Sequence, residues 1–304
     1  MKYRNIKKNN LRNTGRIPYI HHIISFIFRE VLFCIILPLV IYPSIETNEG
    51  FYLVSDVIFL SIFNIFILFL AYNSVISQKI FTYYVSIVIL IDHGIINMLI
   101  LNTSCSVIDV ANARLVTYMI SISFILEALV SIYLVYINRF LSWMDVFRKI
   151  GANTRVQNAF FYRQILKALI PYGFFVAFQQ LDSVLFPFTG CMALLTALRG
   201  ALIITSFLQL AFICVNFDSE DVLQRKIAIA FTLLRVGNLM LQLGILIYVK
   251  STLKTGKFFI ASIFSINYMV VQLITLIILI KDLSLFGSGL KEYSRLNSVL
   301  ISLS

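Results

Sequence analysis

The chain has 304 residues, of which 60% are apolar and only 13% are charged, and its mean hydropathy is +0.91. A soluble domain carries about 25% charged and about 45–50% apolar residues, so a soluble enzyme, a disordered tail and a secreted disulfide scaffold are excluded. The composition predicts an all-α integral membrane protein. Helices rather than strands are expected to cross the bilayer, because the long apolar runs do not alternate with polar residues as barrel strands do.

A basic arm, residues 1–22, precedes the first apolar stretch. Such a segment is expected on the cytoplasmic side, where each Lys or Arg near anionic headgroups contributes about 1 kcal/mol to membrane affinity. No aromatic-rich platform or folded soluble domain accompanies it, so lipid rather than nucleic acid is its expected partner. The basic residues of the arm are Lys2, Arg4, Lys7, Lys8, Arg12 and Arg16.

Eight apolar stretches follow the arm, each suited to a helix of about 20 residues that crosses the hydrocarbon core. The first is the least regular, because Arg29 and Glu30 lie inside it. Either Arg29 extends back to the cytoplasmic headgroups, or residues 17–30 form an interfacial helix and seven crossings remain. The stretches are Ile23–Pro43, Tyr52–Tyr72, Ile80–Leu101, Leu115–Ile137, Ile165–Phe186, Cys191–Val215, Ile227–Val249 and Phe258–Ile280.

The distribution of lysine and arginine predicts the orientation of these spans. Most of these residues lie in the arm and in alternate loops, which are predicted to share the cytoplasmic side. The opposite side carries only Lys250, Lys254 and Lys257, with Arg114 at the start of the fourth span. Both ends of the chain are therefore expected in the cytoplasm. The predicted organisation is the arm, four spans (23–137), a basic cytoplasmic loop (138–164), four more spans (165–280) and a cytoplasmic tail (281–304).

Charged residues inside the spans are candidate functional residues, because a charge in hydrocarbon needs a partner or a water-filled cavity. Asp182 and Arg199 lie about equally far from the turn that joins the fifth and sixth stretches. Because these two spans are expected to be adjacent and antiparallel, we expect the two residues to form a salt bridge. A structural clasp is the first interpretation of this pair, and gating or substrate binding is the second.

A second group of charged residues is expected near mid-membrane. It comprises Asp92 and His93 in the third stretch, Glu127 in the fourth and Arg235 in the seventh. Two carboxylates with one arginine leave a net negative charge unless one acid is protonated, which suits a proton or cation pathway. A packing network without a transport role is the alternative.

Small residues within the spans predict where helix backbones approach each other closely. Gly237 and Gly244 in the seventh stretch, and Gly200 with Ala201 in the sixth, are the expected positions. Small side chains at these residues allow the backbones of neighbouring spans to approach each other closely.

Cysteine, histidine and sequon positions predict little further chemistry. Cys105 and Cys191 fall on the predicted outer side, where an oxidising compartment can join them in a disulfide, and Asn102 is a candidate glycosylation site there. His21 and His22 are adjacent and point about 100° apart on a helix, so no metal site is predicted. No catalytic triad, P-loop or nucleotide-binding motif appears, and neither enzymatic activity nor a cofactor is expected.

One segment resembles other membrane proteins. It contains Phe-Arg-Lys-Ile-Gly-Ala-Asn over 147–153, Phe-Tyr-Arg-Gln-Ile-Leu-Lys over 161–167, and then Phe174-Phe175 and Phe178-Gln179. This order resembles a stretch of certain uncharacterised multipass membrane proteins of fungal type. The resemblance implies only a cytoplasmic segment that leads into a membrane helix.

These features favour a transporter or channel-like protein for an ion or small solute, because the spans are even in number, the loops are short and charges share a depth. The main alternative is a seven-span, chemoreceptor-like receptor or signalling protein that contacts a cytoplasmic partner through the 138–164 loop. A non-transporting membrane chaperone or assembly subunit is the third. The expected location is the plasma membrane or an endomembrane.

Overall fold

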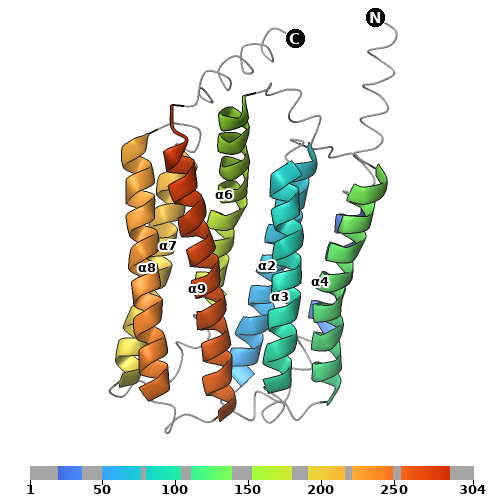
Figure 1. Ribbon diagram of the computed structural model, residues 1–304. Helices are drawn as coiled ribbons and strands as arrows, with labels where there is room; N and C mark the ends of the chain where they lie inside the picture. Colours follow the sequence, from blue (N-terminus) through green and yellow to red (C-terminus); the bar gives the residue numbers. More distant parts are fainter. Residues whose placement is uncertain are drawn as a thin grey trace, which may run out of the picture. The chain divides into compact units, whose positions relative to one another are not determined.

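The computed structural model describes residues 20–35, 50–76, 80–103, 111–138, 153–179, 191–215, 221–248 and 255–287. Within these ranges all regular secondary structure is helical and no strand occurs, so the prediction of an all-α fold is confirmed. A first helix over residues 20–35 precedes seven longer helices (Figure 1). These are α2 (Gly50–Ile76), α3 (Ile80–Thr103), α4 (Ala111–Asn138), α6 (Thr154–Gln179), α7 (Cys191–Val215), α8 (Val222–Tyr248) and α9 (Thr255–Ser284).

Five of the described helices are long and apolar enough to cross a membrane. A shorter apolar stretch lies in α2, at Ser61–Ser74. These helices are consistent with a multi-pass membrane protein, whereas the count of eight spans and the cytoplasmic position of both ends stay predictions. The five candidate spans are Phe81–Leu99 in α3, Tyr118–Tyr136 in α4, Leu194–Phe212 in α7, Val222–Tyr248 in α8 and Ala261–Ser284 in α9.

The distribution of polar side chains is the reverse of that in a soluble bundle. Large apolar side chains project from the helices, and Tyr136 and Ile247 are 82% and 68% exposed. Polar side chains such as Asn64, Ser86 and Gln242 are fully buried. In lipid, exposed apolar groups carry no penalty and buried polar groups link helices by hydrogen bonds, so this pattern suits helices that are surrounded by a bilayer.

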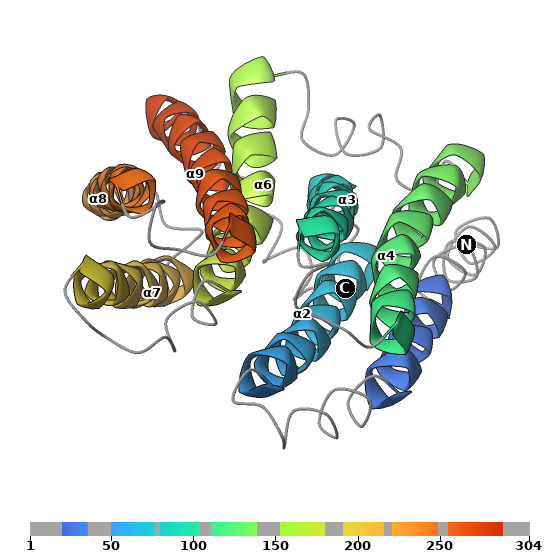
Figure 2. The same cartoon turned by 90° about the horizontal axis from the view of Figure 1, so that it is seen from below.

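The chain divides into two compact units. Unit 1 comprises Met1–Ser142 and Thr255–Ile263, and unit 2 comprises Trp143–Lys254 and Phe264–Ser304. Unit 1 thus contains the first helix and α2 to α4, while unit 2 contains α6 to α8 and most of α9. In unit 1, α3 packs against both α2 and α4, and in unit 2, α7 packs against both α6 and α8 (Figure 2).

Side-chain caps determine where α6 and α8 begin. The backbone N–H of Arg155 donates to Oδ1 of Asn153 at 3.0 Å, and that of Leu223 donates to Oδ1 of Asp221 at 2.9 Å. Asn and Asp at this position satisfy amides that the first helical turn leaves without partners. As a result α6 begins inside the 138–164 segment that the sequence predicts to be a loop. The polar composition of this segment does not prevent a helix from forming in its last residues.

Close approach of helices occurs at a glycine that was not predicted. A Cβ atom built on Gly94 of α3 would lie 2.8 Å from Cγ1 of Ile125 and 3.2 Å from the backbone oxygen of Ser121, both in α4. The described residues show no such approach at the predicted glycines of the second group of spans, because a small residue permits close packing without requiring it. An added Cβ would have no other described atom within 4 Å at Gly200, Gly237 or Gly244.

Candidate functional site

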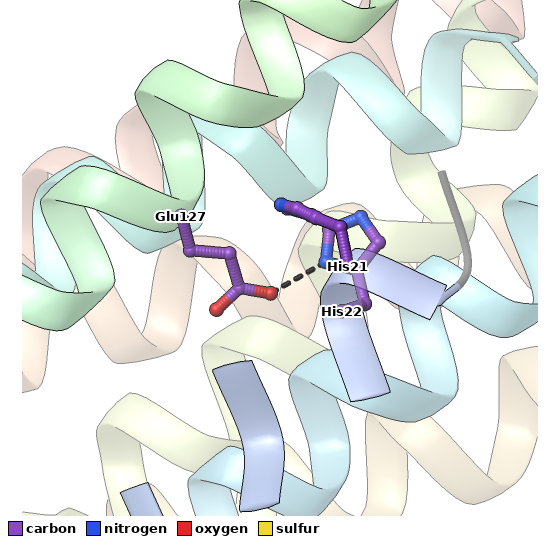
Figure 3. Close-up of side chains that lie close together, drawn as sticks. All are labelled: His21, His22 and Glu127. Atoms are coloured by element: carbon purple, nitrogen blue, oxygen red, sulfur yellow. Dashed lines mark hydrogen bonds and ion pairs between the residues drawn. The ribbon is translucent and has the colours of Figure 1, made fainter. Parts of the chain in front are cut away.

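A buried carboxylate, that of Glu127 in α4, is the centre of a polar network in unit 1. Its Oε1 atom lies 2.5 Å from Nδ1 of His22, and its Oε2 atom accepts a hydrogen bond from Nη1 of Arg29. Both partners belong to the first helix, and all three residues are at most 3% exposed. Figure 3 shows the carboxylate facing His22, with His21 beside it. The ion pair therefore joins the first helix to α4.

The spacing of residues in the first helix explains how its charged side chains reach the interior. His22 and Arg29 are seven residues apart, which is about two helical turns, so they share one face. The opposite face is apolar and exposed, with Ile24, Ile27 and Val31. The sequence left two positions open for Arg29, at the headgroups or in an interfacial helix. The structure buries it against α4, where Glu127 supplies the opposite charge, and its depth in the membrane stays a prediction.

A second carboxylate, that of Glu30, extends the same network to α2. Its oxygens accept hydrogen bonds from Oγ of Ser61 and from Nδ2 of Asn64, each at 2.8 Å. Asn64 in turn accepts a hydrogen bond from Nε of Arg29 at 2.6 Å. Arg29 thus bonds to Glu127 directly and is linked to Glu30 through Asn64, and with neutral imidazoles the network carries a net charge of −1.

Aromatic rings cover one side of this network. His93 stacks on Phe63 with ring centroids 3.7 Å apart, and it meets Phe124 edge-on at 5.2 Å. The guanidinium carbon of Arg29 lies 4.4 Å from the centroid of Phe124, a cation–π contact that stabilises a desolvated guanidinium. The predicted candidate His93 therefore lies beside the network without bonding to Glu127, and its neighbour Asp92 is half-buried.

The other predicted mid-membrane charge, Arg235 of α8, lies in unit 2 and has neutral partners. Its guanidinium donates to Oγ of Ser206 at 3.2 Å, to Oε1 of Gln209, and to Oγ1 of Thr232 at 3.3 Å. Oγ of Ser206 also lies 2.6 Å from the hydroxyl of Tyr268. Within the described ranges, no carboxylate forms an ion pair with Arg235. The sequence grouped this arginine with the acid of α4, whereas the structure gives each its own set of partners.

A further buried charge cluster in unit 2 was not singled out from the sequence. Asp282 of α9 forms ion pairs with Nε of Arg163 in α6 at 3.2 Å and with Nε of Arg225 in α8 at 2.9 Å. The ring of Phe286 lies 5.4 and 5.8 Å from the two guanidinium carbons. The sequence assigned both arginines to cytoplasmic loops as orientation signals. The sequence signal that could have indicated the cluster is the acidic residue Asp282, two residues after the last predicted span.

Several predicted site residues lie outside the described parts of the chain. Asp182 and Cys105 belong to segments that the structure does not describe, and the side chains of Asn102 and Cys191 are likewise not described. The salt bridge of Asp182 with Arg199, the Cys105–Cys191 disulfide and glycosylation at Asn102 therefore stay predictions. Arg199 itself is buried in α7.

Two adjacent histidines and one glutamate form a candidate set of metal ligands. His21, His22 and Glu127 each offer a ligand atom, and these atoms lie within 4.8 Å of one another (Figure 3). The two imidazole rings are 4.3 Å apart and nearly perpendicular. Sequence reasoning missed this set, because adjacent histidines alone do not share a helix face and the third ligand comes from a distant helix.

Comparisons with protein families, curated proteins and solved structures find no match to this chain. The resemblance of the 147–179 segment to multipass membrane proteins of fungal type therefore stays an expectation from its residues. The function has to be inferred from the geometry of the buried polar groups.

Proposed function

We propose that the protein is a transporter or channel-like protein for an ion or small solute, and that the Glu127 network takes part in moving a proton or another cation. The observation that carries this proposal is the buried contact of Glu127 with both Arg29 and His22. A charge in a membrane helix costs roughly 3 kcal/mol on insertion scales, and such charges commonly mark ion pathways or proton relays. A simple structural clasp would need one acid and one base, whereas this network adds a second acid and a histidine.

The arrangement suits transfer of a proton through the imidazole of His22. Its Nε2 atom lies 3.0 Å from the hydroxyl of Tyr83, while its Nδ1 atom faces Glu127. A proton that arrives at Nε2 and leaves from Nδ1 would cross the ring without a change of partner. Because the network carries one net negative charge with neutral histidines, one added proton brings it to neutrality. Arg29 would stay bonded to the other oxygen of Glu127, Oε2, while the proton is transferred.

Flux measurements test the proposal. The purified full chain is reconstituted into liposomes, and proton entry is followed with an enclosed pH-sensitive dye under an imposed potential, with Na⁺ and K⁺ uptake measured in parallel. Glu127→Gln should abolish the flux that the wild-type chain supports. Asp221→Asn is the matched control, because it removes an exposed carboxylate at the cap of α8 and can keep the cap. Flux that is equal in Glu127→Gln and wild type would overturn the proposed role of this network.

The same preparation separates the alternative functions. A receptor or signalling protein, or an assembly subunit, would show no flux above that of empty liposomes, and a partner would instead co-purify with the chain in fixed stoichiometry. We propose no enzymatic step and no nucleic-acid partner, and we assign the basic arm to the anionic lipid surface. Liposomes that contain anionic lipid are therefore the appropriate membrane for this assay.

A further inference from the structure

The histidine pair beside Glu127 has the chemical character of a transition-metal site. Two imidazoles and one carboxylate are ligands that Zn²⁺ and its neighbours in the first transition row prefer, and three protein ligands with one open position are common in such sites. His22 and Glu127 are buried, and His21 is half-buried. All three ligand atoms lie within 4.8 Å of one another, whereas tetrahedral coordination at about 2.1 Å per bond needs separations of about 3.4 Å. Small side-chain shifts would therefore complete the site.

Hydrogen bonds around His21 leave one of its nitrogens available as a ligand. The hydroxyl of Ser131 donates to the backbone oxygen of Glu127 at 2.7 Å, and the same Oγ lies 3.3 Å from Nε2 of His21. Because this hydroxyl has already used its hydrogen, it accepts the N–H of Nε2, and the lone pair of His21 lies on Nδ1. That Nδ1 atom is buried and has no hydrogen-bond partner among the described residues. A buried basic nitrogen that has no partner among the described residues is a suitable ligand for a metal ion.

The other two ligands are held by outer partners in the way that metal sites require. His22 contacts the hydroxyl of Tyr83 through Nε2, which leaves Nδ1 to face the site. Arg29 bonds to Oε2 of Glu127 and leaves Oε1 directed at the histidines. Partners of this kind orient ligating imidazoles and carboxylates. A bound ion would take the place of the proton between Nδ1 of His22 and Oε1 of Glu127, and their 2.5 Å contact would open to accommodate it. The displaced proton would move to Nε2 of the same neutral ring, which would then donate to the hydroxyl of Tyr83.

The charge of the surroundings favours a cation despite the nearby arginine. Arg29 is offset by Glu127, and Glu30 adds a second carboxylate two hydrogen bonds away through Asn64. With neutral histidines the network has a net charge of −1, so a divalent ion changes it to +1. The magnitude of the charge is therefore not increased when the ion enters.

We propose that His21, His22 and Glu127 bind one divalent transition-metal ion of the Zn²⁺ class. The site links the first helix to α4, so the ion would stabilise this contact. A bound ion would also occupy the two atoms between which the proposed proton transfer takes place, so the metal-bound form would not carry out that transfer. The proposal goes beyond the proposed transport function, and it can be tested in detergent without a flux measurement.

Metal titration of the full chain tests the proposal. The protein is purified without a histidine tag, stripped with a chelator, and titrated with Zn²⁺ by equilibrium dialysis and with Co²⁺ by visible absorption. We expect one ion per chain, with visible Co²⁺ bands typical of nitrogen and oxygen ligands. His21→Phe keeps a ring in the same place and should weaken Zn²⁺ binding at least about 100-fold, since loss of an outer partner alone costs 10–100-fold. Substoichiometric binding by the wild-type chain would overturn the proposal.

Two further variants keep the test decisive. Glu127→Gln should also abolish the Co²⁺ bands. Because this change also removes the ionic partner of Arg29, it can prevent folding, and in that case the result for His21→Phe decides the test. His93→Phe is the matched control, because it removes another buried imidazole from an aromatic contact with Phe63 and leaves the three ligands intact. Its Zn²⁺ affinity should stay within about threefold of wild type. Equal affinities of His21→Phe and wild type would show that the ion binds elsewhere and would reject the site.

Discussion

The two units of the protein stabilise a buried arginine in different ways. In unit 1, Arg29 is paired with a carboxylate and has a second carboxylate nearby. In unit 2, Arg235 is surrounded by a serine, a glutamine and a threonine. A guanidinium can thus be buried by an opposite charge or by several neutral dipoles. The two solutions differ in what remains when the arginine is removed.

This difference has energetic consequences for each unit. Removal of one member of a buried ion pair leaves an uncompensated charge, which costs about 3–5 kcal/mol. Removal of a charge that has only neutral partners loses hydrogen bonds of about 1 kcal/mol each and at the same time removes the cost of a buried charge. Unit 1 should therefore be more sensitive than unit 2 to neutralisation of its arginine.

The largest expected effect is that of Arg29→Met. This change keeps side-chain volume but leaves Glu127 and Glu30 without a cation, so we expect a loss of about 3–5 kcal/mol in the free energy of unfolding. Unfolding by SDS in mixed micelles measures the loss. The double variant Arg29→Met/Glu127→Gln should be more stable than the sum of its single changes predicts, because pairs in contact couple by about 0.5–3 kcal/mol. Additive effects would contradict the ion pair.

Glycine variants compare the packing of the two units and have the second largest expected effect. Gly94→Ala should cost about 1–3 kcal/mol, because its methyl group would lie 2.8 Å from Ile125 and 3.2 Å from the backbone of Ser121. Gly237→Ala is the matched control in unit 2, where the added methyl group meets no other described atom, and it should change stability by less than about 0.5 kcal/mol. The same SDS titration measures both. Equal costs would mean that α3 and α4 are not closely packed at this residue.

The smallest expected effect is that of Arg235→Met. It removes hydrogen bonds to Ser206, Gln209 and Thr232 but also removes a buried charge, so the net change in unfolding free energy should be about 1 kcal/mol or less. Comparing its loss in unfolding free energy with that of Arg29→Met under the same conditions measures the difference between the two units. A loss as large as that of Arg29→Met would indicate an anionic partner outside the residues that the structure describes.

Sequence reasoning identified some of the buried charges but not their partners. Glu127 and Arg235 were predicted to lie at similar depth, and both are buried. Depth follows from the rise of 1.5 Å per residue along a helix, so it can be counted from the sequence. The rotation and neighbours of each helix cannot be counted in this way, because apolar residues surround these helices on most sides.

Arg29 illustrates the same limit. The sequence shows a charged residue inside an apolar stretch and leaves two positions at the membrane surface open for it. The contact that the structure shows joins residues 98 positions apart, and nothing in the local sequence of either helix specifies such a pairing. The metal ligand set is a similar case, since His22 and Glu127 are 105 positions apart.

The amino-acid composition alone determined the class of this protein, because so large an apolar fraction is stable only in lipid and lipid permits only internally bonded helices or closed barrels. The length of the apolar runs then selected helices. Only the tertiary structure decided which buried charges compensate each other, which glycine admits a neighbouring helix, and that two histidines meet a carboxylate. These outcomes depend on the packing of distant helix faces, and the physical reason is that burial energy in lipid is nearly the same for any apolar face.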